Sequence, residues 1–198
     1  MSNLKNLFVR ALLALSFLAL APAALAGPVY RVSLNTEAWK GQSGFLDLSY
    51  GGLVGSGTGS AFVSNFSGDF DDSVEVYHDN EKSSGSREEG FTLVSGDMLA
   101  FVSQAVRFGD MFSFDLSFGT LGEGLAADFG IGLTDVDYFA LDGFPGFTFT
   151  LLAGEDTPLP YEQVPGVGVA AVPEPSEWIL MATGLFLLGA TRRMHKQG

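Results

Sequence analysis

The stretch Phe112-Ser113-Phe114-Asp115-Leu116-Ser117-Phe118 alternates strictly between apolar and polar side chains. Successive side chains of a β-strand point to opposite faces of a sheet, so this period of two is typical of a strand with one buried face. Similar patterns recur on both sides of this stretch. The candidate strands cover residues 29–34, 45–48, 61–66, 91–94, 98–102, 112–118, 129–133 and 147–152.

Turns rich in glycine separate these segments, for example at Gly51-Gly52, Ser95-Gly96-Asp97 and Asp142-Gly143. Glycine, aspartate and serine favour turns, and only residues 36–40 have weak helical character. Many short strands joined by turns predict an all-β fold, a single antiparallel β-sandwich. The spacing of the strands leaves open whether the sandwich is jelly-roll-like or immunoglobulin-like.

The composition excludes several classes of protein. The chain has 198 residues with 23 acidic and 10 basic side chains and no cysteine. Without cysteine there is no disulfide framework, no Cys-based zinc site and no thiol nucleophile. A formal net charge of −13 argues against nucleic acid as a partner, because phosphate contacts need clustered lysine and arginine.

The first 26 residues predict a secretory signal peptide. Lys5 and Arg10 provide a basic start, residues 11–21 form an apolar run, and Ala24 and Ala26 are the small residues that signal peptidase requires. A cut after Ala26 would make Gly27 the new N-terminus. The alternative is an uncleaved anchor, for which the apolar run is short. The central domain is therefore expected to be exported.

The C-terminus has three parts in a fixed order. The motif Val172-Pro173-Glu174-Pro175-Ser176 precedes an apolar segment at 178–191, and a basic tail follows. The segment has 14 residues, about 21 Å as a helix against a hydrocarbon core of ~30 Å, so it predicts a marginal transmembrane helix. Basic residues that flank such a helix stay in the cytoplasm, which places the motif outside. The anchoring residues are Trp178, Leu185 and Leu188, and the basic residues are Arg192, Arg193 and Lys196.

This order of motif, helix and basic cluster resembles the PEP-CTERM sorting signal of exosortase substrates in Gram-negative bacteria. The resemblance implies that an exosortase-type membrane protease recognises Pro173-Glu174-Pro175 and removes the helix. The chain would then pass from the inner membrane to the cell envelope or the extracellular space. Such proteins commonly belong to producers of biofilm and exopolysaccharide. Glu177, Met194 and His195 depart modestly from the pattern. An ordinary C-terminal anchor on a proline-rich stalk is the alternative.

Four parts are therefore expected: a signal peptide (1–26), a β-sandwich domain (27–152), a stalk (153–172) and a sorting signal (173–198). The stalk is predicted because prolines and glycines crowd this stretch and favour a semi-rigid linker. Residues 27–172 contain 21 acidic and 5 basic side chains, a net charge of −16. Such a charge keeps an exported domain soluble and repels anionic surfaces.

Residues 69–90 are predicted to form a long acidic loop in which only residues 74–77 are strand-like. Carboxylates at Asp69, Asp71 and Asp72, or at Asp135 and Asp137, can supply oxygen ligands for Ca²⁺. Neither cluster fits an EF-hand loop, and acidic turns on an acidic protein are the favoured interpretation. No cofactor is therefore expected.

Motifs for catalysis are weak. His78 is expected to be a solvated loop histidine, because no serine carries a nucleophile elbow. The G-x-G-x-x-A pattern at residues 122–127 precedes a predicted strand, whereas a dinucleotide site needs a helix there. Glycosidase chemistry needs only two carboxylates, but no pair can be singled out from so many.

These observations predict an exported, non-catalytic surface or matrix protein associated with extracellular polysaccharide, with carbohydrate binding as a sharper version. Sugar sites stack aromatic rings on sugar faces and add a few polar groups. The candidate aromatic residues, each of which can equally belong to the core, are Trp39, Tyr50, Tyr77 and Tyr138. The alternative function is a secreted, glycosidase-like hydrolase with two carboxylates.

Overall fold

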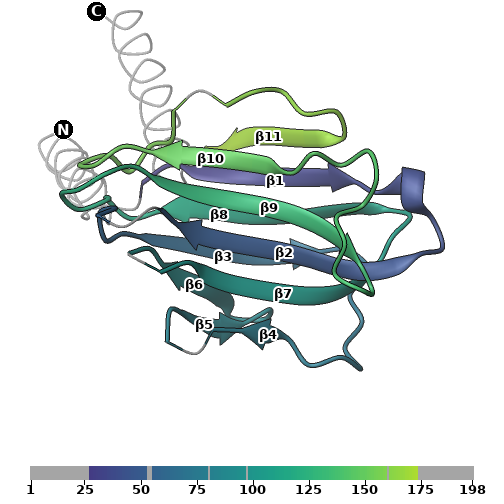
Figure 1. Ribbon diagram of the computed structural model, residues 1–198. Helices are drawn as coiled ribbons and strands as arrows, with labels where there is room; N and C mark the ends of the chain where they lie inside the picture. Colours follow the sequence, from purple (N-terminus) through teal and green to yellow (C-terminus); the bar gives the residue numbers. More distant parts are fainter. Residues whose placement is uncertain (1–26, 53–54, 80, 97, 160, 174–198) are drawn as a thin grey trace, which may run out of the picture. The chain divides into compact units, whose positions relative to one another are not determined.

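A computed structural model describes residues 27–52, 55–79, 81–96, 98–159 and 161–173 (Figure 1). These residues form strands joined by turns and one short 3-10 helix, η1 (Glu37–Trp39). The strands are β1 (Val29–Asn35), β2 (Ser43–Gly51), β3 (Ser60–Ser67), β4 (Tyr77–His78), β5 (Ser83–Ser86), β6 (Gly90–Val94), β7 (Ala100–Arg107), β8 (Met111–Phe118), β9 (Ala127–Asp135), β10 (Phe147–Leu151) and β11 (Val167–Val172). Within the described ranges, no helix is long and apolar enough to span a membrane.

The strands assemble into two antiparallel sheets. One sheet has six strands in the order β11-β1-β8-β3-β6-β5, and the other has five strands in the order β10-β9-β2-β7-β4. Figure 1 shows one sheet lying behind the other, and the side chains of their facing sides form one apolar core. The predicted all-β fold is therefore confirmed as a sandwich-like pair of antiparallel sheets.

Strand β8 follows the alternation that its sequence predicts. Phe112, Phe114, Leu116 and Phe118 are each at most 2% exposed and point into the core. Burying a side chain of this size contributes about 1.5–3 kcal/mol, so this face holds β8 between β1 and β3. Asp115 points away from the core, yet it is also buried.

The five-stranded sheet supplies the other half of the core by the same alternation. In β2, Leu46, Leu48 and Tyr50 are at most 1% exposed, and in β9 the buried residues are Phe129, Ile131 and Leu133. Phe45, Asp47 and Ser49 of β2 alternate with these residues and therefore lie on the side of the sheet that faces away from the core.

Two strand predictions need correction. Strand β7 runs from Ala100 to Arg107, whereas the sequence predicted residues 98–102. Ser103 and Ala105 face away from the core but are buried, so buried and exposed positions do not alternate along this strand. The acidic segment 69–90 contains β4 and β5, and of the strand expected at 74–77 only Tyr77 is in a strand.

The stalk predicted for residues 153–172 is wrong. Within this stretch β11 pairs with β1 over the whole register from Val29 opposite Val172 to Leu34 opposite Val167. Val167 and Val169 pack against the core, and a Cβ atom at Gly168 between them would lie 2.6 Å from Ser33 Oγ of β1. The compact folded unit is therefore 27–172 and not 27–152.

Candidate functional site

The two predicted processing points flank the folded unit. Gly27 is buried, and a Cβ atom there would lie 2.9 Å from the carbonyl oxygen of Phe118, so no larger residue fits without a shift. Pro173 is exposed and follows β11 directly. Because Val29 pairs with Val172, the chain enters β1 and leaves β11 at the same end of two neighbouring strands.

Most of the predicted sorting and anchoring residues lie outside the described residues, so those predictions stay predictions. These residues are Ala24, Ala26, Glu174, Pro175, Ser176, Trp178, Leu185, Leu188, Arg192, Arg193 and Lys196.

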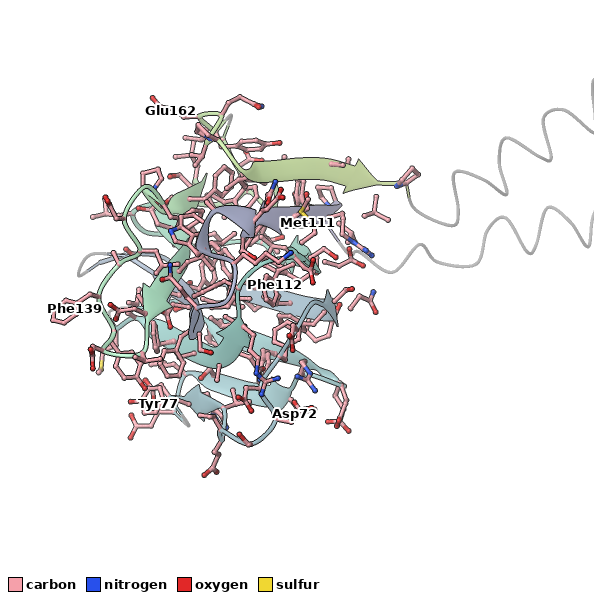
Figure 2. The ribbon with its side chains drawn as sticks, turned by 90° about the vertical axis from the view of Figure 1, so that its right-hand side faces the viewer. Asp72, Tyr77, Met111, Phe112, Phe139 and Glu162 are labelled. Carbon is pink, nitrogen blue, oxygen red and sulfur yellow. The ribbon has the colours of Figure 1, made fainter. Side chains whose placement is uncertain are left out.

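Three acidic residues that were weighed as weak calcium candidates, Asp69, Asp71 and Asp72, are partners of arginine. Arg107 lies 3.3 Å from a carboxylate oxygen of Asp69 and 2.7 Å from one of Asp71. Arg87 lies 2.7 Å from Asp72, which Figure 2 labels. Hydrogen bonds from the Ser73 side chain and backbone, followed by the charge of Arg107, lower the pKa of Asp71. No group of three or more acidic or histidine side chains within the described ranges is arranged to hold a metal ion.

The second acidic candidate builds a turn. The carboxylate of Asp135 accepts hydrogen bonds from the backbone N–H groups of Asp137 and Phe139, each at 2.9 Å. The carbonyl of Asp135 accepts a third from the N–H of Tyr138. This turn holds Tyr138 at a φ of +64°, in the left-handed region that bulky residues rarely occupy. Asp135 therefore serves to position the aromatic residues that follow it.

Arg31, Asp115 and Asn65 form a polar cluster on the outward side of the six-stranded sheet, and the sequence did not predict it. Two of the guanidinium nitrogens of Arg31, Nε and Nη2, donate to the Asp115 carboxylate. Asn65 Nδ2 also donates to it, at 2.8 Å. Burial alone would raise the pKa of Asp115, but the hydrogen bonds from Arg31 and Asn65 outweigh it, and the pKa is lowered. The cluster satisfies a carboxylate that packing would otherwise leave buried and unpaired.

Asp71 and Asp115 do not fit the acid of a two-carboxylate hydrolase. A glycosidase needs one carboxylic acid with a raised pKa beside a second carboxylate. The pKa of Asp71 and that of Asp115 are lowered instead, and each carboxylate has an arginine partner. His78 also differs from its prediction. It lies in β4 and is half-buried, and its Nδ1 has no hydrogen-bond partner among the described residues.

The four candidate sugar-binding aromatic residues differ in burial. Tyr50 is fully buried in the core, which was one of the two possibilities left open for it, and burial raises the pKa of its hydroxyl. Trp39 is half-buried between Phe108 and Phe144, and its Nε1 donates to the carbonyl of Asp142 at 3.1 Å. Tyr77 and Tyr138 remain, with exposed fractions of 63% and 62%.

Tyr77 and Tyr138 both lie over the side of the five-stranded sheet that faces away from the core, which we call the outer face. In Figure 2, the labelled Tyr77 and Phe139, the neighbour of Tyr138, project from the same side of the molecule. Strand register places the following residues on this face: Phe45, Asp47, Ser49, Phe101, Ser103, Gly130, Gly132, Thr134 and Thr148.

Two aromatic pairs flank the middle of the outer face. The Tyr138 ring stacks on Phe45 with centroids 4.5 Å apart and an interplanar angle of 8°. The Tyr77 ring lies against Phe101 at 6.1 Å. Phe45 is opposite Ala105, and Phe101 lies four residues before Ala105 in β7. At ~3.4 Å per residue, about 14 Å of strand separates the two pairs.

Asp47 lies between the two aromatic pairs and is held in place by two hydroxyl groups. Ser103 Oγ donates to Asp47 Oδ1 at 2.6 Å, and Thr134 Oγ1 donates to Asp47 Oδ2 at 2.8 Å. Opposite Asp47 in β9 is Gly132, with Gly130 two residues away, so these two outward positions of β9 have no side chains. The alternation of β2 already indicated that Asp47 faces outward, but its partners come from two other strands.

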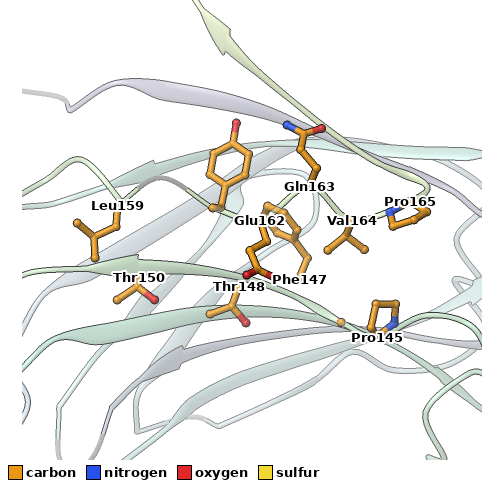
Figure 3. Close-up of a pocket in the computed structure, with 11 residues that line it drawn as sticks. Pro145, Phe147, Thr148, Thr150, Leu159, Glu162, Gln163, Val164 and Pro165 are labelled. Carbon is orange, nitrogen blue, oxygen red and sulfur yellow. The ribbon is translucent and has the colours of Figure 1, made fainter.

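A separate cavity of about 550 Å³ lies at the edge of the same sheet, between β10 and the segment formed by Leu159 and residues 161–165 (Figure 3). Phe147, Thr148, Tyr161 and Glu162 are among its lining residues. Tyr161 packs on Phe147 at 5.3 Å, and the N–H of Leu159 donates to the carbonyl of Thr150, so the segment partly covers the edge of β10.

Comparison with known proteins does not assign this chain to a family. No family model, no curated protein and no solved structure matches it.

Proposed function

We propose that this chain is an exported, non-catalytic cell-surface or extracellular-matrix protein that is cut at both ends and associates with extracellular polysaccharide. The observation that carries the proposal is the extent of the folded unit. It covers residues 27–172, so it begins directly after the predicted signal-peptidase site and ends directly before Pro173. A cut at either point would remove no residue of the core.

The pairing of β1 with β11 supports the same topology. Both processing points lie at one end of these two strands, because Val29 is opposite Val172. A domain whose N-terminal and C-terminal segments both enter one membrane needs its two ends on the same side. The partners that the proposal implies are signal peptidase, the inner membrane during transit, and an exosortase-type membrane protease.

Because residues 167–172 form strand β11, the protease would meet its motif beside the folded domain and not at the end of a stalk. The motif starts at Val172, which is the last residue of β11 and pairs with Val29, and Pro173 follows it directly, with no linker between strand and motif. Proline has no N–H to donate to a β-ladder, which is a physical reason for the strand to end there. The proposed cleavage therefore takes place close to the folded domain.

The first prediction is that replacing Pro173, Glu174 and Pro175 by alanine stops release of the domain. The chain would be expressed in a Gram-negative host that has an exosortase-type protease, and its location would be followed by fractionation. We expect the variant to stay in the inner membrane because the protease no longer recognises it.

A matched control replaces Glu162 and Pro165, which are exposed and lie outside the motif. This control is expected to be released like the unaltered chain. Release of the Pro173-Glu174-Pro175 variant at the normal rate would contradict the proposal.

A further inference from the structure

We infer that the outer face of the five-stranded sheet binds a neutral polysaccharide chain, which lies across Asp47 with sugar rings against Tyr138 and Tyr77. This inference deepens the proposed function and rests on it for the source of the ligand. Four features of the face carry it, namely its exposed rings, its glycine floor, its central carboxylate and its charge.

The aromatic rings are held in place for contact with a ligand. Phe45 covers one face of the Tyr138 ring, while 62% of Tyr138 remains exposed. The left-handed backbone at Tyr138 is strained, and three hydrogen bonds to Asp135 hold the turn that contains it. Phe139 beside it is 70% exposed. Exposed rings that stand against a sheet are suited to stacking on the apolar face of a sugar.

The floor beside Asp47, on the side of β2 that faces away from β7, is built from glycine. Gly130 and Gly132 occupy the two outward positions of β9 that lie opposite Ser49 and Asp47. Glycine weakens a strand, and in a strand interior it marks places where another molecule or backbone approaches closely. A Cβ atom at Gly132 would lie 3.5 Å from Asp47 Cβ, an ordinary contact, so the packing of the sheet does not itself require glycine there.

Asp47 supplies acceptors for sugar hydroxyls. An ionised carboxylate has about four lone-pair sites. Ser103 and Thr134 use one site on each oxygen, which fixes the orientation of the carboxylate and leaves an acceptor site on each oxygen. Asp47 is half-buried, so these sites are open to a ligand that lies on the glycine floor.

The charge of the face selects an uncharged polymer. Among the described strands of this sheet, Arg107 is the one basic residue at an outward position, and Asp69 and Asp71 hold it in ion pairs. The folded unit as a whole carries a net charge of −16. A polysaccharide with carboxylates would be repelled, and so would a second copy of this chain. A neutral chain of sugars can stack on the rings and donate hydroxyl hydrogen bonds to the carboxylate of Asp47.

The inference is tested by native affinity electrophoresis of the full chain in a mild detergent, produced in a host without an exosortase-type protease. The gels contain hydroxyethylcellulose, glucomannan, arabinoxylan, laminarin or dextran as neutral polymers, and alginate as the anionic one. We expect at least one neutral polymer to retard the chain and alginate not to retard it.

Variants locate the binding site. Tyr138→Ala, Tyr77→Ala and Gly132→Val should each weaken retardation by the neutral polymer at least tenfold, because they remove a ring or fill the floor. Phe62→Ala is the matched control, since Phe62 is 41% exposed on the outward side of the six-stranded sheet. Thermal unfolding checks that each variant is folded. If Tyr138→Ala does not fold, Gly132→Val still tests the outer face.

The inference is overturned if no neutral polymer retards the chain, if alginate binds more tightly than the neutral polymers, or if the outer-face variants bind as well as Phe62→Ala. These outcomes leave the proposed export and processing intact, because those are tested by location and mass.

Discussion

Single carboxylates in this domain take different roles according to their neighbours. Asp115 is buried with Arg31 and Asn65, Asp47 is half-buried with two hydroxyls, and Asp71 is bonded to Ser73 and Arg107. The pKa of Asp115 and that of Asp71 are lowered, so their partners hold these two carboxylates in the charged form. The acidic composition is therefore not a collection of equivalent surface charges.

Asp115 carries the prediction at the scale of a residue. Asp115→Asn should lower the free energy of unfolding at pH 7 by about 1–3 kcal/mol, because the hydrogen bonds to the charged carboxylate are weakened. The pKa of Asp115 is lowered in the folded state, so its contribution is present above the unfolded pKa of about 3.9 and is lost as the pH falls through the folded pKa. The difference between the two chains should thus shrink below pH ~4.

Chemical denaturation at a series of pH values measures this difference. Asp110→Asn, at an exposed position, is the control. A constant difference between Asp115→Asn and the unaltered chain from pH 7 down to pH ~2 would show that the Arg31–Asp115 pair does not stabilise the fold.

At the scale of the element, β11 shows that an edge strand can be built from a sequence resembling a linker. Its inward positions, Val167 and Val169, contact the core, while Gly168 and Ala170 face outward. The strand has one neighbour, β1, and closes the six-stranded sheet on that side. Its stability therefore depends on two half-buried valines and one ladder of hydrogen bonds.

We predict that Val169→Ser destabilises the domain by about 1–2 kcal/mol, because it replaces a partly buried apolar side chain by a polar one. Ala170→Ser is the matched control on the neighbouring, exposed position and should change stability by less than about 0.5 kcal/mol. Thermal or denaturant unfolding measures both. Equal effects of the two substitutions would indicate that β11 is not docked against the core.

The sequence predicted those elements whose burial follows from their own pattern. The alternation of residues 112–118 predicted β8 correctly. This strand lies between β1 and β3 in the middle of its sheet, so one of its faces lies wholly on the core. The pattern of β2 could also have predicted that Tyr50 is buried, since it continues the series Leu46 and Leu48. The range predicted for β7 ended too early, at residue 102. The burial of Ser103 and Ala105 depends on neighbours from other strands, which a local sequence pattern does not contain.

The candidate site was only partly predictable for the same reason. Two of the four proposed aromatic residues, Tyr77 and Tyr138, lie on one face, but their rings are placed by Phe101 and Phe45 from other segments. The calcium candidates could not be distinguished from ion pairs, because Arg107 and Arg87 lie far from Asp69 and Asp72 in the sequence. Such pairings appear only when the sheet order is known.

For the whole molecule, the extent of the folded unit links structure to the proposed function. Residues 27–172 hold the core of the described part of the chain and almost all of its acidic charge. The two ends of this unit meet at one end of β1 and β11. A domain built in this way can lose the segments on both sides and keep its fold.

The intact mass of the exported protein, measured by mass spectrometry after purification from a host with an exosortase-type protease, tests this account most directly. The account predicts a polypeptide that begins at Gly27 and ends within a few residues of Val172. A mass of 21.0 kDa, that of the full chain with Met1 and Gly198 still attached, would contradict it.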